Sequence, residues 1–236
     1  MRINKVCFIG HIIDRSGFEL LNEHIENFRE FDLVYISFPQ TRNDLHRLLL
    51  ETKVFKPLPS PNKGRDMFPF LLSLKHANLN IGDIIVKWHD KRRNHLSAVP
   101  LSEDERKKLL SYCIFNGEAP PPLVIPMLER TLCIASTIYG WNLPLSLRIG
   151  SNVDRLFQFS CDEGWNWEDI YKNSLFPSGG IFSARAEVLL RSQWFRGEHA
   201  DIEFGFGGLD GTWAHASERW LGVLMSHSGE LAEVRI

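Results

Sequence analysis

The sequence predicts an α/β fold: a mostly parallel, doubly wound sheet flanked by helices, with a helical segment in the middle of the chain. Over roughly the first 90 residues, short apolar runs alternate with stretches of helical periodicity, the pattern of parallel α/β folds. Apart from Asp83 and Lys87, the run at 83–88 is apolar, as expected of a central strand. A chain of 236 residues with 44% apolar residues can also bury a core of ordinary size.

The first half of the chain supplies most of the predicted sheet. Residues 5–13 and 31–38 are rich in β-branched and aromatic residues and predict two strands. A helix is expected over 43–52, followed by a Pro-rich turn at 56–62. The helix predicted between the two strands rests on apolar residues at helical spacing, namely Phe18, Leu21, Ile25 and Phe28.

The next elements are a helix over 66–77, with Pro69 in its tolerant first turn, and the central strand at 83–88. Ser102 is the expected N-cap of a helix over 103–115. The remaining expectations are a helix over 124–132, a strand within 131–139, a strand pattern over 175–185 interrupted by a Gly pair, a helix over 212–226 and a terminal strand over 231–236.

Composition and motifs exclude several classes of protein. With 27 Lys and Arg against 29 Asp and Glu, the net charge is −2, so we expect no nucleic-acid partner. No apolar run approaches the roughly 18–20 residues of a membrane span, which favours a cytoplasmic protein or one peripheral at the inner face of the membrane. Neither GxGxxG nor GxxxxGK[ST] occurs, so the usual dinucleotide and P-loop phosphate sites are absent.

The four cysteines lack zinc-site spacing and are expected to be buried free thiols. They are Cys7, Cys113, Cys133 and Cys161.

The first candidate site is a turn that opens onto a helix, Asn62-Lys63-Gly64-Arg65-Asp66. Gly64 permits a positive φ, the N–H groups at the helix start point outward, and Lys63 and Arg65 add positive charge. Such a turn can bind a diphosphate or a ribose. The alternative is a solvated turn in which Asp66 caps the helix.

The second candidate site is the end of the central strand. Lys87 and His89 share one face of the strand, and Lys91 and two arginines follow. Ligands of doubly wound sheets bind where such strands end. The alternatives are a solvated run of charge, or half of a metal site formed by His89 with Asp90.

The third candidate site is the segment 210–219. His215, Glu218 and Arg219 lie at i, i+3 and i+4 and form one polar helix face. The alternative is a solvated helix face, with Asp210 serving only as the N-cap.

Taken together, these segments resemble the rhamnan synthesis protein F family of bacterial polysaccharide glycosyltransferases. The resemblance spans residues 8–229 in order. It rests on Phe8-Ile9-Gly10-His11, Asn62 to Asp66, Lys87-Trp88-His89-Asp90-Lys91, Gly180-Ile181-Phe182-Ser183-Ala184-Arg185, and Asp210 to Arg219. It implies a single GT-A-like domain over 1–236, with a nucleotide-sugar half at about 1–100 and an acceptor and catalytic half at about 101–236.

The resemblance also implies partners and roles. The expected partners are a nucleotide-diphosphate sugar, with rhamnose or a related deoxysugar, and a glycan acceptor that can be lipid-linked at the membrane. The donor would be held by His11, Asn62, Lys63, Gly64, Arg65, Asp66, Lys87, His89 and Lys91, and the acceptor or sugar by Gly179, Gly180, His215 and Arg219. No cofactor is expected to be required.

The expected mechanism is inverting displacement, with Asp210 as base and Glu218 as the reserve candidate. No Asp-x-Asp motif occurs, so fixed side-chain cations are expected to stabilise the leaving diphosphate, and the role of a divalent metal stays open. Two rivals are a non-catalytic module that binds nucleotide sugars or glycans, and a hydrolase with clustered metal ligands.

Overall fold

A computed structural model describes residues 5–61, 66–90, 100–114, 133–137, 142–177, 180–196, 211–228 and 231–235. The strands are β1 (Val6–His11), β2 (Leu33–Pro39), β3 (Lys56–Ser60), β4 (Ile84–His89), β5 (Cys133–Thr137), β6 (Asn142–Pro144), β7 (Leu175–Pro177), β8 (Ile181–Arg185) and β9 (Leu231–Arg235). They form a seven-stranded sheet in the order β3-β2-β1-β4-β8-β5-β9 and a two-stranded sheet of β6 and β7.

The large sheet is mostly parallel, as predicted. Within the described part of the chain, β8 alone runs against its two neighbours, β4 and β5. From β1 the chain moves to β2 and β3 on one side and then returns to β4 on the other. The strand order therefore reverses between β1 and β4, and a doubly wound sheet binds its ligands at the carboxyl ends of the strands at such a switch point.

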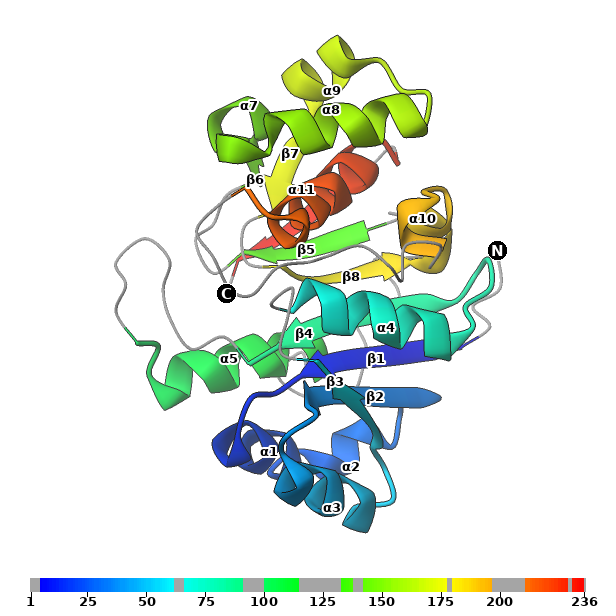
Figure 1. The fold of residues 1–236 in the computed structure, drawn as a ribbon. Coiled ribbons are helices and arrows are strands. Elements are labelled where there is room, and N and C mark those ends of the chain that lie inside the picture. Colours follow the sequence, from blue (N-terminus) through cyan, green and yellow to red (C-terminus); the bar gives the residue numbers. More distant parts are fainter. Residues whose placement is uncertain are drawn as a thin grey trace.

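Helices cover both faces of the sheet (Figure 1). They are α1 (Arg15–Asn22), α2 (Ile25–Phe28), α3 (Asn43–Glu51), α4 (Met67–Ala77), α5 (Glu103–Ile114), α7 (Leu145–Arg148), α8 (Val153–Asp162), α9 (Trp167–Asn173), α10 (Ala186–Leu190) and α11 (Trp213–Ser226). Alternation along β4 sends Val86 and Trp88 into the core shared with α1, α3 and α5, and Ile85 into the core shared with α4 and α11.

The Pro-rich turn predicted at 56–62 is wrong in part, because residues 56–60 form the edge strand β3. An edge strand has a neighbour on one side only, so half of its N–H groups need no partner in the sheet. Prolines are tolerated at those positions, and Pro57 and Pro59 alternate along β3 accordingly.

Two further predictions need correction. The helix expected between β1 and β2 is two short helices, α1 and α2. The strand pattern at 175–185 is two strands in different sheets, because β7 pairs with β6 and β8 pairs with β4 and β5. Gly180, just before β8, has a φ of +62°, a conformation that glycine adopts without steric cost.

The helices α7, α8 and α9 were not predicted at all, and the helix expected at 124–132 lies outside the described residues.

Other local predictions are confirmed. Ser102 caps α5 in a capping box: its Oγ accepts from the Glu105 N–H at 3.2 Å, and the Glu105 carboxylate accepts from the Ser102 N–H at 2.8 Å. Cys7 and Cys113 are buried free thiols, as predicted, but the prediction is wrong for Cys161, which is exposed at the end of α8. No described helix is both long enough and apolar enough to cross a membrane.

Candidate functional site

The candidate site lies at the carboxyl ends of β1 and β4, the switch point of the sheet. As predicted, Lys87 and His89 point to the same side of β4. Both reach Asp66, the residue before α4: Lys87 Nζ lies 2.5 Å and His89 Nδ1 3.4 Å from Asp66 Oδ2. Residues from two of the sequence motifs therefore meet in one cluster.

Lys87 is bound within the protein rather than presented to solvent. The residue is only 1% exposed. Besides its ion pair with Asp66, its Nζ donates to the Gly180 carbonyl at 2.7 Å and lies 5.4 Å from the centre of the Phe70 ring. The expectation that Lys87 contacts a diphosphate therefore does not fit its position, because its ammonium group is enclosed by these partners.

Asp66 occupies the N-cap position of α4, but its side chain makes no capping hydrogen bond. Its carboxylate, 18% exposed, turns to Lys87 and His89 instead. The alternative of a solvated turn capped by Asp66 is therefore wrong for this residue. The other residues of that turn, Asn62, Lys63, Gly64 and Arg65, lie outside the described residues, as does Lys91.

Gly180 and Glu218 complete the cluster from the far end of the chain. A methyl group built on Gly180 would lie 3.3 Å from Lys87 Nζ, 3.4 Å from Glu218 Oε1 and 3.6 Å from Asp66 Oδ2. Any side chain at position 180 would therefore fill the space between an ammonium group and two carboxylates. Gly179 and Asp210 lie outside the described residues.

His11 closes the site at the end of β1. Its Nδ1 lies 3.0 Å from Ser37 Oγ on the neighbouring strand β2. Burial, assisted by the nearby Lys87 charge, lowers the pKa of His11 to about 4, although Asp66 acts in the opposite direction. His11 is therefore neutral at physiological pH and adds no positive charge to the site.

His215 does not lie on a solvated helix face, as the alternative for this segment required, whereas Arg219 is half-buried. His215 is 7% exposed, and its Nδ1 lies 2.8 Å from Thr212 Oγ1. Arg219 donates to the His215 carbonyl at 3.1 Å. Thr212 is also the N-cap of α11, because its Oγ1 accepts from the His215 N–H. The reading of Asp210 as this cap is therefore wrong.

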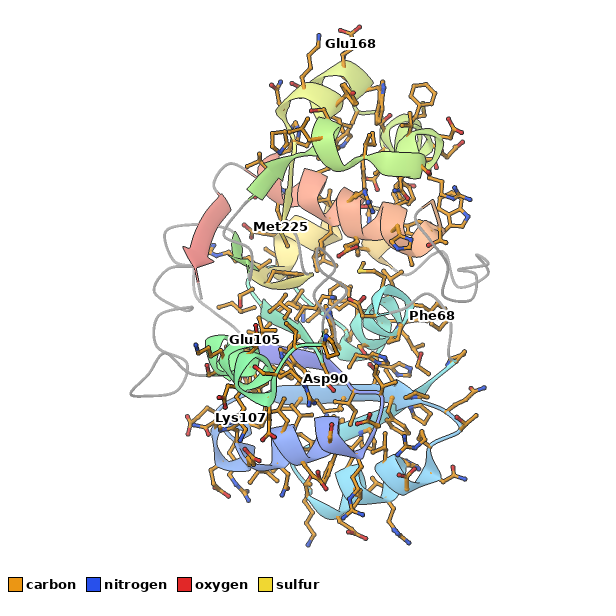
Figure 2. All side chains as sticks on the ribbon, turned by 90° about the vertical axis from the view of Figure 1, so that its left-hand side faces the viewer. Phe68, Asp90, Glu105, Lys107, Glu168 and Met225 are labelled. Atoms are coloured by element: carbon orange, nitrogen blue, oxygen red, sulfur yellow. The ribbon has the colours of Figure 1, made fainter. Side chains whose placement is uncertain are left out.

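Asp90 is engaged by an arginine and does not form half of a metal site. Its side chain is fully buried, and Arg106 on α5 binds both of its oxygens, at 2.7 and 3.0 Å. Figure 2 shows Asp90 beside α5, the helix that carries the labelled Glu105 and Lys107. The described part of the chain holds no group of three or more His, Cys, Asp and Glu side chains placed for a metal.

Sequence reasoning missed the residues that support this site. Ser37 orients His11, Phe70 covers Lys87, and Arg106 neutralises Asp90. Ser37 carried a signal, since it is a polar residue inside an otherwise apolar strand that ends at the same edge as β1. Phe70 and Arg106 carried none, because their roles depend on contacts between distant parts of the chain.

No family model matches the chain. It is similar to two curated proteins of Xanthomonas campestris pv. campestris, both called uncharacterized protein WxcX: 30% identical over 169 residues in strain ATCC 33913 and 31% over 175 residues in strain B100. Each match covers 71% of this chain but 23% of the relative, so the chain spans less than a quarter of these proteins. A solved structure, described as the crystal structure of a mycobacterial protein, aligns over 78% of this chain and 54% of its own, with 16% identity and a TM-score of 0.38.

Proposed function

We propose that the protein is a GT-A-like glycosyltransferase of the rhamnan synthesis protein F type. It would move a sugar, rhamnose or a related deoxysugar, from a nucleoside-diphosphate donor to a growing cell-surface polysaccharide. One observation carries the proposal: each of the five segments behind the resemblance contributes a group to the cluster at the carboxyl ends of β1 and β4. These groups are His11, Asp66, Lys87 with His89, Gly180 and Glu218.

The described residues support specific roles in donor binding. Asp66 and His89 keep some exposure, 18% and 14% of their side chains, and are assigned to the nucleotide or sugar. Lys87 is assigned to positioning, because its ammonium group holds Asp66 and the Gly180 carbonyl in place. Lys63, Arg65 and Lys91 in the sequence are then the cations proposed for the leaving diphosphate.

The transfer step needs a base for the acceptor hydroxyl. We assign this role first to Asp210 and second to Glu218, whose carboxylate lies next to Gly180. Attack by the acceptor on the face opposite the diphosphate would invert the anomeric centre. Because the sequence has no Asp-x-Asp motif, we expect transfer to persist in EDTA.

The test incubates the protein with a panel of nucleoside-diphosphate sugars, with and without lipid-linked and soluble glycan acceptors, and measures acceptor-dependent release of nucleoside diphosphate. Asp210→Asn and Glu218→Gln are compared with Glu168→Gln, a substitution on α9 whose carboxylate is 82% exposed. Loss of the base is expected to slow transfer about 100- to 10,000-fold without loss of donor binding, while Glu168→Gln has no effect.

The panel also separates the rivals. Donor binding without transfer to any acceptor would favour a non-catalytic binding module. Release of nucleoside diphosphate that does not depend on an acceptor, and that EDTA abolishes, would favour a hydrolase. Absence of binding to every nucleotide and nucleotide sugar would contradict the proposed donor site.

A further inference from the structure

A chain of hydrogen bonds at the carboxyl ends of β1 and β2 determines which ring nitrogen of His11 carries the proton. The Ser37 hydroxyl lies 3.0 Å from the Gly10 carbonyl and 3.0 Å from His11 Nδ1. A carbonyl can only accept, so the single hydroxyl proton of Ser37 is donated to Gly10. Ser37 Oγ must then accept from His11, which places the ring proton on Nδ1 and leaves Nε2 as an acceptor.

The ring keeps this form at physiological pH. The same burial that lowers the pKa of His11 to about 4 disfavours a second proton on Nε2. No hydrogen-bond partner of Nε2 occurs among the described residues. His11 therefore offers one lone pair, with a fixed orientation and no charge.

His11 lines a small pocket whose described residues present acceptors rather than free cations. The pocket is lined by Ile9, Gly10, His11, Ser37, Asp66, Phe70, Lys87 and Trp88. Among these described lining residues the one ammonium group is that of Lys87, and it is already bound to Asp66 and to the Gly180 carbonyl. The Asp66 carboxylate is a second acceptor. Such a pocket favours an uncharged group that carries O–H or N–H donors over a phosphate.

We propose that His11 Nε2 accepts a hydrogen bond from a ribose hydroxyl or a base N–H of the bound nucleotide, and that the phosphates lie outside this pocket. The inference rests on the proposed function, since it names the part of the donor that His11 recognises. It makes His11 a residue that determines specificity for the nucleoside and contributes little to binding of the diphosphate.

The first test is independent of any ligand. Nitrogen-15 NMR of labelled histidine in the wild-type protein at pH 7 is expected to show His11 protonated on Nδ1 and unprotonated on Nε2. Ser37→Ala removes the acceptor for Nδ1 and is expected to shift the ring toward the Nε2–H form. Ser73→Ala is the matched control, because it deletes another buried hydroxyl, bonded to the Pro69 carbonyl, away from His11. An Nε2–H ring in the wild type would overturn the proposal.

The second test measures ligand affinity by calorimetry for the wild type, His11→Gln and His11→Phe. The ligands are ADP, GDP, UDP, TDP and inorganic pyrophosphate. For the nucleotide that binds best, His11→Phe is expected to weaken affinity about 3- to 10-fold, the loss typical of one neutral hydrogen bond, while His11→Gln, which keeps an acceptor, loses less. Pyrophosphate affinity is expected to stay within about twofold.

Analogues of that nucleotide then identify which of its groups donates the hydrogen bond to His11. An analogue lacking a ribose hydroxyl, or one methylated on a base N–H, is expected to lose affinity for the wild type but not for His11→Phe, and the one that does so names the group. Equal loss of pyrophosphate and nucleotide in His11→Phe would overturn the inference while leaving the proposed function intact. If no nucleotide binds the wild type, the proposed function falls and the nucleotide assignment falls with it, even where the NMR result stands.

Discussion

At the residue scale, the central feature of the site is a buried lysine whose charge is used inside the protein. Lys87→Met removes the ammonium group that donates to the Asp66 carboxylate and to the Gly180 carbonyl. We expect the free energy of unfolding, measured in urea, to fall by about 3 kcal/mol, because a buried ion pair loses its cation while the carboxylate stays in place. The double variant Lys87→Met/Asp66→Asn is expected to recover part of that loss. A loss below about 1 kcal/mol, the usual contribution of an exposed ion pair, would contradict this role.

His11 gives the protein a pH dependence of stability. Its pKa falls from 6.5 to about 4 on folding, chiefly through burial. Between these values the unfolded chain binds a proton that the folded protein does not, so the free energy of unfolding falls as the pH falls. The expected loss from this residue is at most about 3 kcal/mol, complete below about pH 4. Urea unfolding of the wild type and His11→Gln between pH 7 and pH 4.5 checks this, and parallel curves would show that His11 does not contribute.

At the element scale, Arg106 adds a buried ion pair to the apolar packing that holds α5 against the end of β4. Arg106 binds both oxygens of the fully buried Asp90 side chain and also reaches Ser16 on α1 at 3.3 Å. Arg106→Met is expected to lower the free energy of unfolding by about 3–5 kcal/mol. Arg106→Lys keeps the charge but loses the bidentate hydrogen bonding, so we expect the free energy of unfolding to fall by an intermediate amount. Arg15→Met, which removes an exposed ion pair on α1, is the control. Equal stability of Arg106→Met and Arg15→Met would show that the pair does not hold α5.

The elements differ in how well their sequences predict them. Both ends of β1, β4 and α4 were predicted within two residues, since their apolar patterns agree with their final environments. β3 was missed because its two prolines are acceptable only at an edge, and a sequence does not state which strand lies at the edge. The splitting of 175–185 was missed for a similar reason: it depends on β6 and β4 as partners.

At the scale of the whole molecule, the position of Lys87 and His89 at the end of the central strand was predictable, and the ion pairing around them was not. The shared face of Lys87 and His89 follows from the period of a strand, and the switch point follows from the strand order. The partners of Lys87, however, are 21 and 93 residues away in the sequence. Because such contacts form only when the sheet is complete, a lysine that looks like a free cation in the sequence becomes a buried structural ion.

In the proposed function, the carboxyl ends of β1 and β4 bind a nucleotide-sugar donor. Hydrogen–deuterium exchange of the wild-type protein, with and without the nucleoside diphosphate that stabilises it most, tests this directly. We expect added protection in peptides that cover His11, the start of α4 and the end of β4, and no change in α8 and α9. Protection confined to α8 and α9, or no protection at any of these ends with saturating nucleotide, would contradict the claim.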